Sequence, residues 1–136
     1  MTMDVTYNKI SIIERCLRRV REVYDNNPES REDFTKQDSI ILNIQRACEA
    51  SIDLAMHLVS KKQLGLPQTS RDAFRLLMEQ RLIEESLANR LQSMVGFRNI
   101  AVHDYQAVNL EILQSIIEKH LDDFTVFTKR IMEIMS

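Results

Sequence analysis

Residues 34–62 read FTKQDSIILNIQRACEASIDLAMHLVSKK, and their apolar side chains recur at intervals of three and four residues. Because an α-helix completes a turn every 3.6 residues, this spacing places the apolar side chains on one face of a helix. Two lysines close the segment, where positive charge suits the helix dipole, and Leu-Gly-Leu-Pro at residues 64–67 ends it. The sequence therefore predicts one long helix whose apolar face comprises Ile40, Ile41, Ile44, Ala47, Cys48, Ile52, Ala55 and Val59.

The segments on either side of this helix have the same helical spacing. Residues 7–25 place Ile10, Ile13, Leu17 and Val20 on one face, and the turn-forming residues Asp25-Asn26-Asn27-Pro28 follow. Further helices are expected over about 70–78, with Ser70 as N-cap, over 87–103, opened by Ser86 or the preceding glutamates, and over about 110–135, with Asn109 as N-cap.

Glycine and proline are scarce, which agrees with long helices. The 136 residues include two glycines and two prolines, far below the usual ~7% and ~5%. A β-rich domain needs such residues at its turns. The expected fold class is therefore all-α, an antiparallel bundle of four long helices plus a short one, in a single domain over residues 1–136.

Composition also narrows the functional class. The formal charge of −2 argues against binding nucleic acid over the whole surface, so any contact with RNA must be local. No apolar run approaches the ~20 residues that span a membrane, and no leader sequence is evident. Cys16 and Cys48 lie in apolar stripes, which predicts buried thiols and suits the reducing cytoplasm. The histidines lack metal-ligand spacing, so we expect no metal and no cofactor.

One stretch concentrates chemically active side chains, and it reads Gly-Phe-Arg-Asn-Ile-Ala-Val-His-Asp-Tyr over residues 96–105. Gly96 lies within a predicted helix, where glycine costs about 1 kcal/mol against alanine, so we expect a bend or a close approach there. Asn99 and His103 share a helical face, whereas Arg98 and His103 are about 140° and 7.5 Å apart. A bend, a helix end near His103 or a second copy of the helix in a two-fold dimer can bring this pair together.

These residue types suit RNA cleavage without a metal ion. A histidine such as His103 can take the proton of a 2′-hydroxyl or donate one to the leaving 5′-oxygen. Arg98 can bind the scissile phosphate and stabilise the charge of the transition state, while Asn99 can orient either group. The expected product is a 2′,3′-cyclic phosphate. An alternative stays open on the residues alone, namely that His103 is a hydrogen-bonded histidine at the edge of the core.

The pattern Arg98, four residues, His103, one residue, Tyr105 resembles the signature of the HEPN superfamily, in the form found in HepT-like ribonuclease toxins. The resemblance extends to residues 38–53, 64–74 and 94–99. It implies a HEPN-type bundle that forms a homodimer with its active cleft at the two-fold axis. It also implies a partner, a minimal nucleotidyltransferase (MNT) antitoxin that transfers AMP from ATP to the motif tyrosine, which is Tyr105 here.

Two functions are therefore consistent with the sequence. The first is a metal-independent endoribonuclease toxin with Arg98 and His103 as catalytic residues and Asn99 in support. The second is a non-catalytic helical module that docks and positions a separate nucleotidyltransferase. The first is favoured because an adaptor has no need of an arginine suited to phosphate beside a titratable histidine.

The remaining polar residues are expected to be structural. Glu49 and Asp53 should form salt bridges with nearby arginines, and His57 should suit the end of its helix. His120 should pair with Asp123 on the surface. A further cluster shares one face of the first helix, where it is a solvated surface by default and an RNA-backbone track if that face borders the cleft: Arg15, Arg18 and Arg19.

Overall fold

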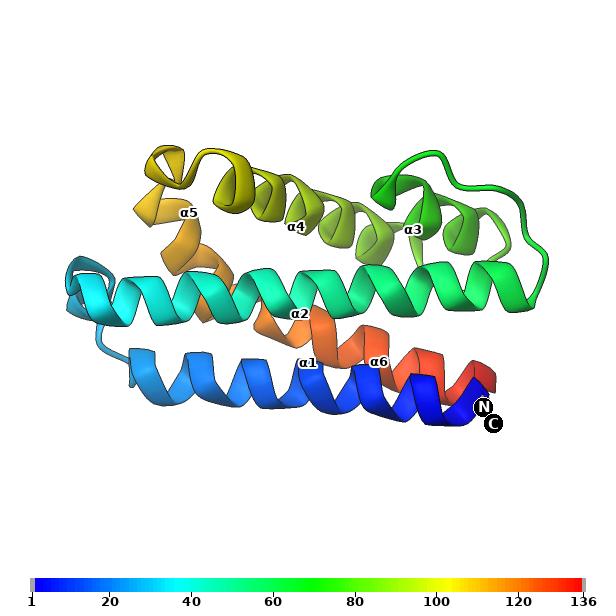
Figure 1. The fold of residues 1–136 in the computed structure, drawn as a ribbon, viewed down its shortest axis with the longest axis horizontal. Helices are drawn as coiled ribbons and strands as arrows, with labels where there is room; N and C mark the ends of the chain where they lie inside the picture. Colours follow the sequence, from blue (N-terminus) through cyan, green and yellow to red (C-terminus); the bar gives the residue numbers. More distant parts are fainter. Residues whose placement is uncertain (1, 136) are drawn as a thin grey trace.

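Helices account for all the regular structure in the computed structural model, which describes residues 2–135 (Figure 1). The α-helices are α1 (Thr2–Tyr24), α2 (Phe34–Lys61), α3 (Ser70–Glu79), α4 (Glu85–His103), α5 (Leu110–Ser115) and α6 (Leu121–Met135). Two 3₁₀ turns, η1 (Pro28–Glu32) and η2 (Tyr105–Ala107), and a π turn, η3 (Ile116–His120), complete them. Helical structure continues without a break from α5 through η3 to α6, so these three elements count as one long helix. Together with α1, α2, α4 and the short α3, they confirm the predicted all-α bundle of four long helices and a short one.

Successive long helices run in opposite directions along the bundle. Helix α1 packs along α2, whose other side carries α3 and α4, and α6 returns beside α1 and α2 (Figure 1). Helix α1 begins and α6 ends at one end of the bundle, whereas α4 ends at the opposite end. Within residues 2–135, no helix combines the length and the apolar character that crossing a membrane requires.

The predicted apolar face of α2 forms the centre of the core. All eight of its members are buried, and the corresponding residues of α1 are buried as well. Phe74 of α3 and Phe127 of α6 meet edge to face, with ring centroids 5.6 Å apart. Burying one large apolar side chain stabilises the fold by about 1.5–3 kcal/mol, so this core holds the helices together.

Several helix ends differ from the prediction. Helix α1 begins at Thr2 rather than near Tyr7, because the fully buried Thr6 lies four residues before Ile10 and extends the same face. The N-cap of α3 is Thr69 rather than Ser70, and its hydroxyl oxygen accepts a hydrogen bond from the amide of Asp72 at 3.2 Å. Helix α4 begins at Glu85, two residues before Leu87, and its N-cap is Glu84, one of the glutamates that the sequence offered, without a side-chain cap hydrogen bond.

The π turn η3 was not foreseen by the sequence pattern, which predicted a regular helix after Asn109. Asn109 itself caps α5 as expected, since its side-chain oxygen accepts hydrogen bonds from Glu111 and Ile112. A π turn holds one more residue than an α turn and shifts the apolar face. Here both Ile116 and Ile117 are buried, although they are adjacent in sequence.

Candidate active site

Helix α4 and the turn that follows it carry the four predicted site residues. The helix stays α-helical through Gly96 to His103, so Arg98 and Asn99 keep the spacing from His103 that the sequence predicted. His103 is the last residue of the helix, and Tyr105 opens η2. Among the described residues, no hydrogen bond or ion pair joins Arg98 to His103. One chain therefore presents the pair on one helix without bringing the two side chains together.

Gly96 makes room for a side chain from α3. A Cβ atom added to Gly96 would lie 2.7 Å from Nη2 of Arg71. The same guanidinium donates from Nε to the backbone carbonyl of Gln92, at 3.2 Å. The expected close approach is therefore made by an arginine that joins α3 to α4.

Arg98 is held loosely between three helices. Its side chain is 21% exposed, Nη2 donates to the hydroxyl of Ser70 on α3 at 3.5 Å, and Nη1 lies 3.7 Å from Oε2 of Glu49 on α2. Both separations lie at or beyond the outer limit of a good hydrogen bond. The buried Nε has no hydrogen-bond partner within the described part of the chain. The predicted pairing of Glu49 with an arginine is confirmed, and the guanidinium keeps unused capacity for an anion.

His103 is exposed on the last turn of α4. Its side chain forms no hydrogen bond or ion pair with any other residue of the described range 2–135, so it is not the hydrogen-bonded boundary histidine of the alternative reading. Asn99 lies one helical turn earlier and is half-buried. The imidazole is thus accessible to a ligand from solvent.

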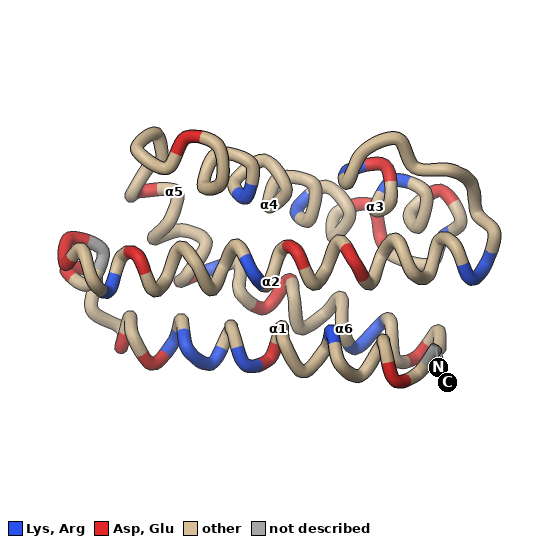
Figure 2. The backbone as a smooth tube through the Cα atoms, in the orientation of Figure 1, with Lys and Arg blue, Asp and Glu red and all other residues tan. Residues whose placement is uncertain are grey.

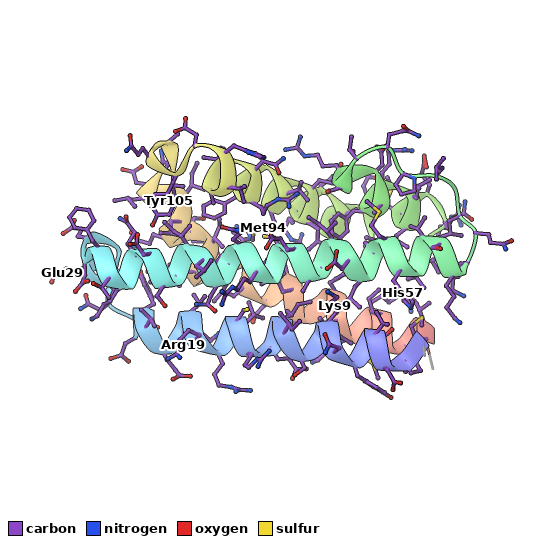
Figure 3. All side chains as sticks on the ribbon, viewed as in Figure 1. Lys9, Arg19, Glu29, His57, Met94 and Tyr105 are labelled. Carbon is purple, nitrogen blue, oxygen red and sulfur yellow. The ribbon has the colours of Figure 1, made fainter. Side chains whose placement is uncertain are left out.

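Tyr105 contacts α2 through a residue that the sequence had not singled out. Its hydroxyl donates a hydrogen bond to Oδ1 of Asp38, and the residue is 40% exposed. Figure 3 labels Tyr105 at the end of the bundle where α4 ends. Partial burial, this hydrogen bond and the negative charge of Asp38 together raise the pKa of Tyr105 to about 12. The phenol is therefore un-ionised and fixed in direction at neutral pH, while part of its ring faces solvent.

The hydroxyl groups of the other two tyrosines are either buried or outside the motif. Tyr24 is buried, and its hydroxyl donates to Oε2 of Glu118 at 2.5 Å. Tyr7 is exposed on α1 and lies outside the motif. Tyr105 is therefore the tyrosine placed beside the candidate catalytic residues.

The remaining polar residues fall mostly where the sequence suggested. Asp53 pairs with Lys9 at 2.8 Å, so the expectation of an arginine partner is wrong for this residue. His57 is half-buried in the last turns of α2, and its Nε2 has no partner within residues 2–135. The basic cluster Arg15, Arg18 and Arg19 is exposed on α1, and α2 lies between that helix and α4 (Figures 1 and 2).

His120 belongs to a partly buried cluster rather than to a surface pair. Its Nδ1 lies 3.2 Å from Oδ2 of Asp123, as the spacing predicted, but Asp123 is only 7% exposed. Nε of Arg90 donates to the other oxygen of the same carboxylate at 2.9 Å. The cluster joins α4, through Arg90, to η3 and α6, through His120 and Asp123, so we assign it a structural role.

The sequence of this chain is similar to that of a family of ribonucleases. Residues 13–131 match the family described as "Ribonuclease HepT-like". The chain is 51% identical over 124 residues to the protein of Shewanella oneidensis named mRNA nuclease HepT, covering 91% of this chain and 93% of that protein.

Solved structures agree with the sequence match. The tri-AMPylated HEPN toxin of Shewanella oneidensis, in complex with an MNT antitoxin, superposes with a TM-score of 0.91 at 49% identity, covering 96% of this chain and 98% of that one. A toxin–antitoxin structure with AMP-PNP gives a TM-score of 0.92 at 48% identity with the same coverage.

Proposed function

This chain belongs to the HepT-like ribonuclease family, and on that premise we propose that it is the ribonuclease toxin of a toxin–antitoxin pair. The similarity to the nuclease of Shewanella oneidensis extends over nine-tenths of the chain, which supports the same class of activity here. The finer proposal is that cleavage needs no metal ion and uses Arg98 and His103, with Asn99 in support.

The state of the two side chains supports these roles. His103 is exposed and unpaired within the described residues, so it can exchange a proton with a bound RNA. Arg98 has only long contacts, so a phosphate can displace Ser70 and Glu49 from its guanidinium at little cost. This combination of a free imidazole and a weakly held guanidinium on one helix is the observation that carries the proposal.

The proposed reaction is an internal transfer within the RNA. His103 removes the proton of a 2′-hydroxyl, whose oxygen attacks the adjacent phosphorus while the bond to the 5′-oxygen breaks. Arg98 stabilises the negative charge that accumulates on the phosphoryl oxygens. A second histidine or a water molecule returns a proton to the 5′-oxygen, and a 2′,3′-cyclic phosphate remains.

A homodimer completes this site in the proposal. The regular α4 keeps Arg98 and His103 about 140° apart around its axis, so one copy serves a single phosphate poorly. Ile100 and Val102 lie between them in sequence and are 45% and 46% exposed. A two-fold partner that packs on α4 would cover these apolar side chains and bring a second Arg–His set to the same cleft.

Regulation follows from the position of Tyr105. We propose that an MNT-type antitoxin transfers AMP from ATP to this hydroxyl, in keeping with the similarity to a tri-AMPylated toxin. A phosphodiester adds about one negative charge and considerable bulk two residues beyond His103. Both effects oppose the approach of an RNA phosphate.

The test of the proposed function uses Arg98→Ala and His103→Ala, compared with Arg75→Ala, which removes an exposed arginine that pairs with Glu79 on α3. Loss of the acid–base group should lower the rate of RNA cleavage by ~10²–10⁴-fold, and loss of the charge-stabilising donor by ~10²–10³-fold. Cleavage with EDTA present, growth after expression and helical circular dichroism are measured for each.

Arg75→Ala should keep the parental rate. Parental cleavage by either site variant would show that the roles are misassigned, and loss of activity in EDTA would contradict the metal-free mechanism. If the parent causes no growth arrest without the antitoxin, the non-catalytic docking module becomes the better explanation.

A further inference from the structure

The hydrogen bond between Tyr105 and Asp38 joins two parts of the chain that are 67 residues apart in sequence. Asp38 is exposed on the first turns of α2, and it forms no ion pair with a lysine or arginine of the described residues. Its carboxylate is therefore directed at the Tyr105 hydroxyl, with no ion-pair partner among the described side chains. Because the tyrosine is also 40% exposed, a second molecule can reach the hydroxyl while Asp38 holds it.

Transfer of a nucleotide to a tyrosine requires removal of the phenolic proton. The raised pKa of Tyr105, about 12, means that only on the order of 10⁻⁵ of the phenol is ionised at pH 7. Spontaneous ionisation thus provides very little nucleophile. The carboxylate that disfavours ionisation in the resting state is also in contact with the proton that must leave.

We propose that Asp38 is the general base of the modification reaction, accepting the proton of the Tyr105 hydroxyl as its oxygen attacks the α-phosphorus of ATP. The bond from the tyrosine oxygen to the α-phosphorus forms, and the bond from that phosphorus to the bridging oxygen of the β-phosphate breaks. Pyrophosphate leaves with the electron pair, and the proton passes from Asp38 to water. This inference rests on the proposed modification of Tyr105.

In this proposal the two proteins contribute different groups to the reaction. The nucleotidyltransferase binds and orients the triphosphate, whereas the toxin supplies both the nucleophile and the base from its own α2 and η2. A simpler structural role for Asp38 would be to fix the direction of the tyrosine ring. The two roles differ in what an amide at the same position can do, because an amide oxygen accepts a hydrogen bond but does not take up the proton.

The experiment compares Asp38→Asn, Asp38→Ala and Asp38→Glu with the parent. Each purified chain is incubated with the antitoxin, ATP and Mg²⁺, and the AMP adduct on the peptide that contains Tyr105 is followed by mass spectrometry. The Asn and Ala variants should both lower kcat for the first transfer by ~10²–10⁴-fold with little change in KM for ATP, and the Glu variant should recover part of the rate. Asp53→Asn is the matched control, since it removes a carboxylate of the same helix that pairs with Lys9.

If Asp38→Asn is modified at the parental rate and only Asp38→Ala is slow, Asp38 is not the general base and only positions the tyrosine. Thermal melting of each variant verifies that it is folded, so that a slow rate is not read from an unfolded chain. If the parent itself gains no adduct on Tyr105, the proposed modification fails and the inference with it. An adduct on the parent together with an unimpaired Asn variant overturns the inference alone.

Discussion

Cys48 lies in the apolar face of α2, fully enclosed between helices, and its thiol contacts the carbonyl oxygen of Met94 on α4 at 3.6 Å. Burial raises its pKa from 9.0 to about 12. Tyr105 shifts in the same direction, with a pKa raised from 10.0 to about 12. Both groups therefore hold their protons more tightly in the folded chain than in the unfolded one.

This sets the direction of a pH effect on stability. Above pH 9 the unfolded chain loses the Cys48 proton while the folded chain keeps it, so the free energy of unfolding should fall by about 1.4 kcal/mol per pH unit toward pH 12. Below pH 9 the stabilisation from this group is fully present. Urea unfolding between pH 8 and 11 measures the slope, and Cys48→Ala should show a smaller one. Equal slopes in both proteins would contradict the assignment to this thiol.

The sequence alone identified only some of the residues of the candidate site. The spacing of Arg98, Asn99 and His103 identified them as candidates, because helical geometry relates residues that are close in sequence. Tyr105 was added by the resemblance to the HEPN signature. Their catalytic and acceptor roles stay predictions. Asp38 could not be found in this way, since its contact with Tyr105 depends on how the end of α4 packs on α2.

Among the helices, α4 shows how a glycine inside a regular element can be compensated. Arg71 occupies the space that a Cβ atom of Gly96 would fill. Gly96→Ala should gain up to about 1 kcal/mol of helix propensity and lose about 0.5–1.5 kcal/mol as Arg71 is displaced from Gln92. The net change in the free energy of unfolding should be within about 1 kcal/mol of zero.

The Arg71→Ala background separates the two contributions. Without the guanidinium, Gly96→Ala should stabilise the chain by about 1 kcal/mol in urea unfolding. The same effect in both backgrounds would mean that Arg71 exerts no constraint on this position.

The extent of the helices was predictable where apolar periodicity decides it, and less so at their ends. Thr69 and Ser70 both carry a hydroxyl, so the choice of Thr69 as N-cap depends on backbone angles that composition does not encode. The π turn η3 depends on burying Ile116 and Ile117 together, which is a property of the assembled core.

At the scale of the whole molecule, the exposed apolar side chains of α4 lead to an expectation about assembly. Ile100 and Val102 lie between Arg98 and His103 in sequence and are nearly half exposed. We expect a two-fold homodimer at micromolar concentration, with on the order of 1,200–2,000 Å² buried in total. Ile100→Asp should weaken the dimer and lower cleavage together, because charge is poorly tolerated in an interface core.

Light scattering coupled to size exclusion measures the mass of both proteins, with Ile112→Asp as a control at an exposed isoleucine of α5. A parental chain that elutes as a monomer would remove the second half of the proposed cleft. A dimer unaffected by Ile100→Asp would place the interface elsewhere.

The first turn of α1 and the last turn of α6 lie at one end of the bundle, and the end of α4 with Tyr105 lies at the other (Figures 1 and 3). An affinity tag, a fluorophore or a surface tether attached to the first turn of α1 or the last turn of α6 therefore lies at the end of the bundle opposite Tyr105. A chain immobilised in this way presents the candidate site outward to RNA or to a nucleotidyltransferase. The two helix ends are interchangeable in this respect, so paired labels on them report on binding from the same end of the bundle.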